Sequence, residues 1–316
     1  MDVEFVVVAT GLRFPEGPVW MADGSLIVTE LIGKRLTRID LRSGSAQTLA
    51  EIPGSPNGAA IGPDGALYIC NSGGWRYTDL GGLLVPGDHH GTQAPDYSGG
   101  CIQRLDLESG ELTTLYDSCD GQRLCAPNDL VFDATGAMWF TDHGHIRERD
   151  KDRTGLYYAQ ADGSSIREVV FPLDAPNGVG LAPGGSVVYV AETHVGRVWA
   201  WDLQAPGELA GPPLPAGNGG RLIAGLPGNQ LLDSLAVDGS GRVCVATILN
   251  GGITVIDVNL DEADPDYLRH ISLPDPIVTN ICFGGEGLTT AYVTLSATGQ
   301  VVAFEWPFGA GLALAF

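Results

Sequence analysis

Short apolar runs separated by polar turns occupy the whole chain. One unit recurs six times: a polar residue, an apolar run, a turn that contains Gly, and a second apolar run. Several copies add a third apolar run that ends in Asp, as in residues 36–40 and 198–202. No segment keeps an apolar period of 3.6 residues, so the pattern predicts strands and little helix. The polar residues of the six copies are Glu16, Asn57, Asn128, Asn177, Asp233 and Asn280.

The spacing of the copies predicts the architecture. Successive polar residues lie between 41 and 71 residues apart, and periods of about 40–50 residues with about four strands each are typical of propeller blades. We therefore predict an all-β, six-bladed β-propeller with about four antiparallel strands per blade, in which residues 1–316 form a single domain. The longest spacing indicates an insertion at residues 75–99, expected to form a lid or rim. A sandwich or barrel with coincidentally similar turns is the alternative.

The N-terminal segment lacks the repeated motif but is apolar. Residues 3–9 are therefore expected to supply the outer strand of the last blade, whose inner strands come from residues 279–306. Such a pairing closes the ring and hides two sheet edges at once.

The six polar residues form a candidate cation site. The innermost strand of each propeller blade lines the central channel, so residues just before these strands should converge at one mouth. Two of the six are carboxylates, Glu16 and Asp233, and four are amides. Hard divalent cations prefer such oxygen ligands, and two carboxylates held close together would repel without a cation between them. The alternative is that each residue only caps its own turn.

Composition and charge narrow the function. The chain has 17 Lys and Arg against 38 Asp and Glu, a net charge of −21, so nucleic acid and anionic membranes are excluded as partners over most of the surface. The N-terminus is acidic and too short for a signal peptide, and we expect a cytoplasmic protein. Six cysteines do not make a disulfide scaffold. Cys119 and Cys125 flank a turn, and a bridge between them remains open.

Motifs along the whole chain carry a family resemblance. They are residues 14–20, 127–130 and 177–178, Asp233, and residues 279–285. With these motifs the chain resembles the gluconolactonase/regucalcin (senescence marker protein) family of metal-dependent six-bladed propellers. The resemblance implies one divalent ion held by Glu16, Asn177 and Asp233, with Asn128 as a further ligand or a substrate contact. It also implies hydrolysis of a lactone, with Ca²⁺ as the expected ion and Zn²⁺, Mn²⁺, Mg²⁺ or Fe²⁺ as alternatives.

The chain departs from the family pattern near the expected substrate site. Ala126 stands where family lactonases often carry an Arg that meets the sugar, and His143 and His145 follow a family-like strand. The insertion that begins at Trp75 looks private to this chain. The substrate therefore need not be a gluconate-type lactone.

The expected chemistry is water addition to a carbonyl. A cation would polarise the carbonyl while Asp233 takes the proton of water and Asn128 positions the substrate oxygens. His143, His145 and Trp75 are candidate substrate contacts, although the two histidines could equally lie in a surface loop. We expect a small-molecule substrate and a monomer or small homo-oligomer. Two alternatives stay open: a metal-dependent isomerase or lyase acting on a carbonyl substrate, and a non-catalytic propeller that binds a metal or ligand.

Overall fold

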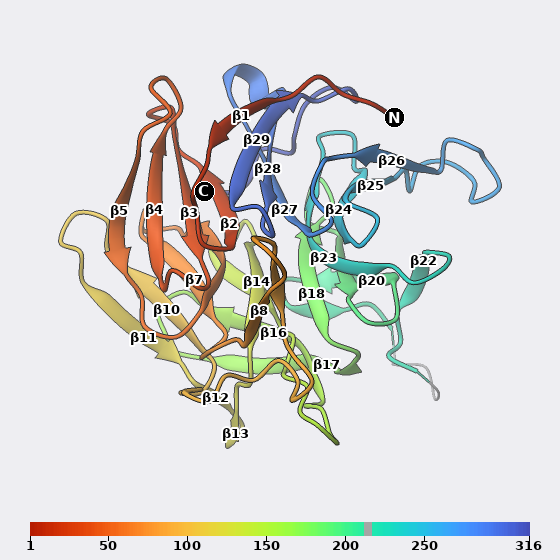
Figure 1. Ribbon diagram of the computed structural model, residues 1–316. Coiled ribbons are helices and arrows are strands. Elements are labelled where there is room, and N and C mark those ends of the chain that lie inside the picture. Colours follow the sequence, from red (N-terminus) through yellow and green to blue (C-terminus); the bar gives the residue numbers. More distant parts are fainter. Residues whose placement is uncertain (212–216) are drawn as a thin grey trace.

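A computed structural model describes residues 1–211 and 217–316. Six antiparallel sheets are arranged in a ring, which confirms the predicted six-bladed β-propeller (Figure 1). The first three blades, each from inner to outer strand, are β2 (Pro15–Trp20), β3 (Ser25–Glu30), β4 (Arg35–Asp40), β5 (Ala46–Glu51); β6 (Pro56–Ile61), β7 (Leu67–Asn71), β10 (Cys101–Leu105), β11 (Leu112–Tyr116); and β14 (Pro127–Phe132), β15 (Ala137–Asp142), β16 (Thr154–Gln160), β17 (Ile166–Leu173).

The other three blades follow the same order. They are β18 (Pro176–Leu181), β19 (Val187–Glu192), β20 (Arg197–Ala205), β22 (Arg221–Gly225), with β21 (Glu208–Leu209) also on β20; β23 (Leu231–Val237), β24 (Val243–Ile248), β25 (Gly252–Ile256), β26 (Leu268–Ser272); and β27 (Val278–Gly284), β28 (Thr290–Leu295), β29 (Gln300–Glu305), β1 (Val6–Ala9). Outside the blades lie two hairpins and a 3₁₀ helix: β8 (Tyr77–Asp79) with β9 (Leu84–Pro86), β12 (Ser118–Cys119) with β13 (Gln122–Arg123), and η1 (Glu286–Leu288).

The hydrophobic core is divided among the six interfaces between neighbouring blades. On β3, Leu26 and Val28 pack toward blade 6, whereas Ile27 between them packs toward blade 2. This alternation follows from the two-residue period of a strand. The second strand of each blade is therefore apolar on both faces, as in β15, all of whose residues are buried.

The N-terminal strand closes the ring as predicted. β1 pairs antiparallel with β29, with Val6 opposite Ala303 and Ala9 opposite Val301 (Figure 1). The last blade is therefore built from both ends of the chain, and its outer edge is covered by β1.

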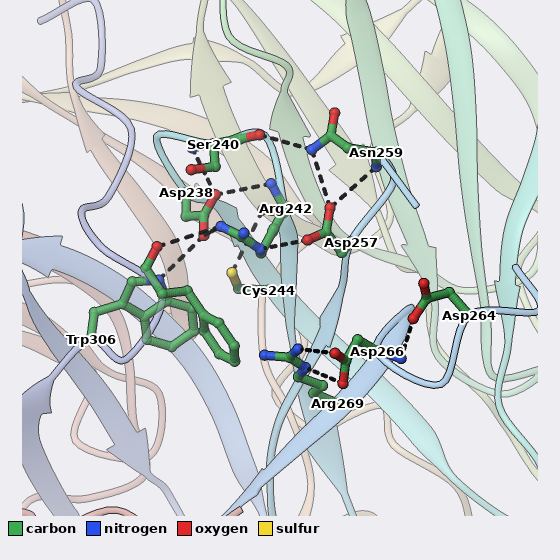
Figure 2. Close-up of polar contacts among 11 residues, drawn as sticks. Asp238, Ser240, Arg242, Cys244, Asp257, Asn259, Asp264, Asp266, Arg269 and Trp306 are labelled. Atoms are coloured by element: carbon green, nitrogen blue, oxygen red, sulfur yellow. Dashed lines mark hydrogen bonds and ion pairs between the residues drawn. The ribbon is translucent and has the colours of Figure 1, made fainter. Parts of the chain in front are cut away.

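Polar turns lie at the channel end opposite the six ring residues. In blade 5, the fully buried Asp238 accepts hydrogen bonds from the backbone N–H of Ser240 and Arg242, and the Trp306 indole N–H lies 3.3 Å away (Figure 2). The Arg242 guanidinium also contacts Asp257, at 2.8 Å. These contacts tie the turn of blade 5 to the segment that follows blade 6.

The cysteines of the described residues form no disulfide bonds. Cys119 packs in the core between blades 2 and 3, and both it and Cys125 are free, as are the other four cysteines of the described residues. The Cys119–Cys125 bridge that the sequence left open is therefore absent.

No helix in the part of the chain that the structure describes is long and apolar enough to cross a membrane.

Candidate functional site

The inner strands bring the six ring residues to one mouth of the channel. All six side chains are buried: Glu16, Asn57, Asn128, Asn177, Asp233 and Asn280. The sequence analysis placed them just before the inner strands, whereas the structure places them within those strands. At this point each inner strand shifts register against its neighbour, for example between Glu16 and Val19. Such a bulge changes the direction in which the side chain points. The turn residues visible in the sequence do not reveal this change.

Glycines next to the ring residues let the inner strands approach closely. A Cβ on Gly178 would lie 2.4 Å from the Leu235 backbone nitrogen, and one on Gly58 would lie 2.5 Å from the Asn128 carbonyl oxygen. Backbone atoms cannot move far enough to make room for a Cβ at such short distances. The Asn-Gly pairs in blades 2 and 4 therefore serve the packing of the inner strands around the axis.

Glu16 is held by the last blade. Asn280 Nδ2 donates to Glu16 Oε2 at 2.7 Å, and the Gly17 backbone N–H donates to the same oxygen. Burial raises the pKa of Glu16 well above its ordinary value, the charges of Asp233 and Asp129 add to this, and the bonds from Asn280 and Gly17 oppose it. Asn280, which the family resemblance did not place among the metal ligands, thus orients this carboxylate.

Asp233 and Asn177 lie together across the interface of blades 4 and 5. The Ser234 backbone N–H donates to Asp233 Oδ1 at 3.1 Å, and Ser234 Oγ donates to Asn177 Oδ1 at 3.4 Å. Asn177 Nδ2 donates to Thr193 Oγ1 at 3.2 Å. Burial raises the pKa of Asp233 to about 7, although the Asn177 amide lowers it. The charged form of Asp233 therefore lacks a full set of partners within the protein.

The donor set suits a hard cation. Within residues 1–211 and 217–316, the buried Oδ1 atoms of Asn57 and Asn128 have no hydrogen-bond donor, and no Lys, Arg or His nitrogen lies within 4.0 Å of Glu16 or Asp233. No group of three or more His, Cys, Asp or Glu side chains in those ranges is arranged as a metal site. A cation here would thus be held by two carboxylates supplemented by amide oxygens, a combination that Ca²⁺ accepts.

Asp129 is a third buried carboxylate near the axis, which sequence reasoning did not select. It accepts the backbone N–H of Leu130 at 2.9 Å and that of Val179 at 3.1 Å, and Leu235 also donates to it. Burial raises its pKa to about 7, and these three bonds oppose the rise. Asp129 therefore joins blades 3, 4 and 5. The available signal was that Asp follows Asn128 where Gly follows Asn57 and Asn177.

The insertion between β7 and β10 of blade 2 makes contacts with blades on several sides of the ring. The Leu84 backbone N–H donates to the Ala297 carbonyl at 3.0 Å, after β28 of blade 6. The Thr92 backbone N–H donates to the Ile146 carbonyl at 2.8 Å, after β15 of blade 3. The Tyr77 ring lies 5.0 Å from that of Phe14, at the start of blade 1. The insertion thus touches blades 1, 3 and 6 at the mouth that carries the ring residues.

The two candidate histidines differ in their surroundings. His143 is buried beside Trp75, with ring centroids 5.3 Å apart, and its Nδ1 lies 2.8 Å from the Gly144 carbonyl. Burial lowers the pKa of His143 to about 3, so the neutral ring donates from Nδ1 and keeps Nε2 as an acceptor. His145 has both ring nitrogens near protein atoms, Nε2 at 3.1 Å from the Ser72 carbonyl and Nδ1 at 3.3 Å from Thr92 Oγ1. It ties the insertion to blades 2 and 3.

A comparison with known protein families places the chain. The model of the SMP-30/Gluconolactonase/LRE-like region matches residues 14–297. The chain belongs to this family. The family resemblance carried by the sequence motifs is thereby confirmed.

Individual relatives are distant. The chain is 26% identical to a gluconolactonase of Zymomonas mobilis over 324 residues, which covers 94% of this chain and 79% of the relative. The structure of a gluconolactonase from Xanthomonas campestris superposes with a TM-score of 0.72 at 22% identity, covering 96% of this chain and 90% of that one. A calcium-binding regucalcin from Agrobacterium tumefaciens superposes with a TM-score of 0.71 at 17% identity, covering 99% of each chain. At these identities the two structures establish the fold alone.

Proposed function

We propose that the protein is a metal-dependent hydrolase that opens a lactone. The observation that carries the proposal is the pair of buried carboxylates, Glu16 and Asp233, in the same ring of inner-strand residues as two buried amide oxygens without donors. Membership of a family whose relatives include a gluconolactonase supports the lactone as substrate class.

Glu16, Asn177 and Asp233 would hold one divalent cation, with Ca²⁺ as the preferred ion. When bound, such an ion polarises the substrate carbonyl and stabilises the oxyanion that water addition creates. Asn280 keeps the Glu16 carboxylate turned toward the site through its 2.7 Å hydrogen bond. The Agrobacterium regucalcin is a calcium-binding protein, which is consistent with this preference.

The remaining steps belong to side chains of the chain itself. Asp233 accepts the proton of the attacking water, which is the role of a general base. Asn128 presents an amide in the ring and would position the substrate oxygens. His143 offers Nε2 as an acceptor for a substrate hydroxyl, and Trp75 forms an aromatic wall beside it.

The insertion is proposed to act as a lid over this site. The insertion contacts blades 1, 3 and 6 across the mouth of the channel, so it would limit the access of water and substrate to the site. His145 and Thr92 would fasten one end of the lid to blade 3. Shortening the lid should change the preference among substrates more than it changes the melting temperature.

A metal-depletion experiment with a lactone panel tests the proposal. The purified protein is treated with a chelator, assayed on aliphatic and sugar lactones, and assayed again after Ca²⁺, Mn²⁺, Zn²⁺ or Fe²⁺ is restored. We expect hydrolysis that disappears on chelation and returns with one of the ions. Hydrolysis that persists without metal would refute the metal-dependent mechanism. Stoichiometric metal binding without turnover of any lactone would favour the non-catalytic alternative.

A further inference from the structure

Tyr77 is a buried phenol without a partner. Its Oη is closed off from solvent and has no hydrogen-bond partner among residues 1–211 and 217–316. Its ring is fixed in an apolar cluster at the channel mouth, 5.0 Å from the Phe14 ring and near Leu31 and Ile277. A buried hydroxyl without a partner is costly, so its presence in an otherwise well-packed cluster requires an explanation.

The phenol lies close to the candidate metal site. Burial raises the pKa of Tyr77 well above its ordinary value, and the negative charges of Glu16 and Asp233 raise it further. Those carboxylates influence the phenol because Tyr77 lies near the axis, although it belongs to the insertion between β7 and β10 of blade 2. A phenol in these surroundings keeps its proton and is a permanent hydrogen-bond donor.

A second donor of the same kind comes from the start of the insertion. The Trp75 Nε1–H is buried and also has no acceptor in the described ranges. Trp75 and Tyr77 belong to one cluster, whose other members from the insertion are Leu83, Leu84 and Val85. The insertion therefore presents two neutral donors within an otherwise apolar wall.

We propose that Tyr77 Oη and Trp75 Nε1 donate hydrogen bonds to the oxygens of a lactone that carries an apolar substituent. This inference rests on the proposed function and names the substrate class of that same site. A lactone has two acceptor oxygens and no donor in its ring, which matches two donors without acceptors. A polyhydroxylated sugar lactone would bring several hydroxyl groups against Leu83, Leu84 and Val85, where each would lose its hydrogen bonds to water. An alkyl substituent would gain from burial against the same side chains.

The variant Tyr77→Phe separates a substrate contact from a structural role. Removal of an unpartnered buried hydroxyl should leave the melting temperature unchanged or raise it. Loss of a donor to the substrate should lower kcat/KM by about 10-fold or more. Calcium affinity, measured by calorimetry, should stay the same because the Tyr77 hydroxyl is not among the proposed metal ligands. The control is Tyr116→Phe, because the Tyr116 hydroxyl is bonded to the Gln160 and Ser165 carbonyls; it should lose stability and keep kcat/KM.

The substrate preference is measured on matched lactones with the full-length protein. We expect kcat/KM to be at least about 10-fold higher for δ-decanolactone than for glucono-δ-lactone. We also expect binding of 2-pentylcyclohexanone, a hydrolysis-resistant analogue that keeps the carbonyl acceptor and has no donor, to weaken in Tyr77→Phe. If lactones are hydrolysed but Tyr77→Phe matches the parent or the sugar lactone is preferred, the inference is overturned and the proposed function stands. If no lactone is hydrolysed and the cyclohexanone analogue does not bind, both are overturned.

Discussion

Acidification should destabilise the protein through the buried His143. The pKa of this histidine is lowered from the ordinary value of 6.5 to about 3, first by burial and then by His194, while Asp174 opposes the shift. The unfolded chain therefore binds a proton below about pH 6.5 that the folded protein excludes. The free energy of unfolding is unaffected by this group above pH 6.5 and falls as the pH drops below it, down to about pH 3.

The expected loss of stability follows from the linkage between protonation and unfolding. Between pH 7 and pH 5 the unfolded state gains about 2 kcal/mol from protonation of one histidine whose folded form stays neutral. The lowered pKa values of His145 and His194 add to the slope of the parent protein, whereas the raised pKa values of the buried carboxyls Glu16, Asp129 and Asp233 oppose it. A comparison of variants isolates the part that belongs to His143.

Equilibrium urea unfolding at pH 7 and pH 5 measures this difference. His143→Asn keeps a donor near the Gly144 carbonyl and cannot be protonated in this range, so its loss of stability on acidification should be smaller than that of the parent by about 2 kcal/mol. His89→Asn, at an exposed position of the insertion, is the control and should behave as the parent does. An unchanged pH dependence in His143→Asn would show that the ring is not held neutral in the folded protein.

Two further predictions concern packing around the axis. Gly178→Ala should lower the free energy of unfolding by about 2 kcal/mol or more, because its Cβ would meet the Leu235 nitrogen at 2.4 Å. The control, Gly225→Ala, has open space around its Cβ and should stay within about 0.5 kcal/mol of the parent in the same urea experiment. Equal effects of the two variants would contradict the close approach at Gly178. Asp129→Ala should cost about 2–4 kcal/mol because three buried backbone N–H groups lose their acceptor, and thermal unfolding that is unchanged would contradict its role in joining three blades.

The repeated part of the fold could be predicted from sequence because each blade repeats the same local pattern. One inner apolar run per copy gave the number of blades, and the lack of the motif in residues 3–9 identified the closing strand that forms β1. The convergence of Glu16 and Asp233 followed from the ring geometry. The bond between Asn280 and Glu16 could not be foreseen, since it joins the first and last blades and depends on side-chain direction at a bulge.

The insertion was predictable as an interruption but not in its chemistry. Nothing in residues 75–99 repeats, so no pattern could indicate that Tyr77 lies near the axis while Thr92 reaches blade 3. Asp129 was missed for a related reason. Its three backbone donors come from different blades, and their positions are defined only once the ring is closed.

The most direct test of the central claim is kcat/KM of Asp233→Asn on the preferred lactone at saturating metal. The substitution keeps the size of the side chain but removes both the negative ligand and the proton acceptor, so the rate should fall by about 100- to 10,000-fold. Asp257→Asn, in the same blade and bonded to Arg242, is the matched control and should keep the activity. Circular dichroism confirms that both variants are folded. A value for Asp233→Asn within a few-fold of the parent would show that Asp233 is neither base nor essential ligand, and the proposed mechanism would be wrong.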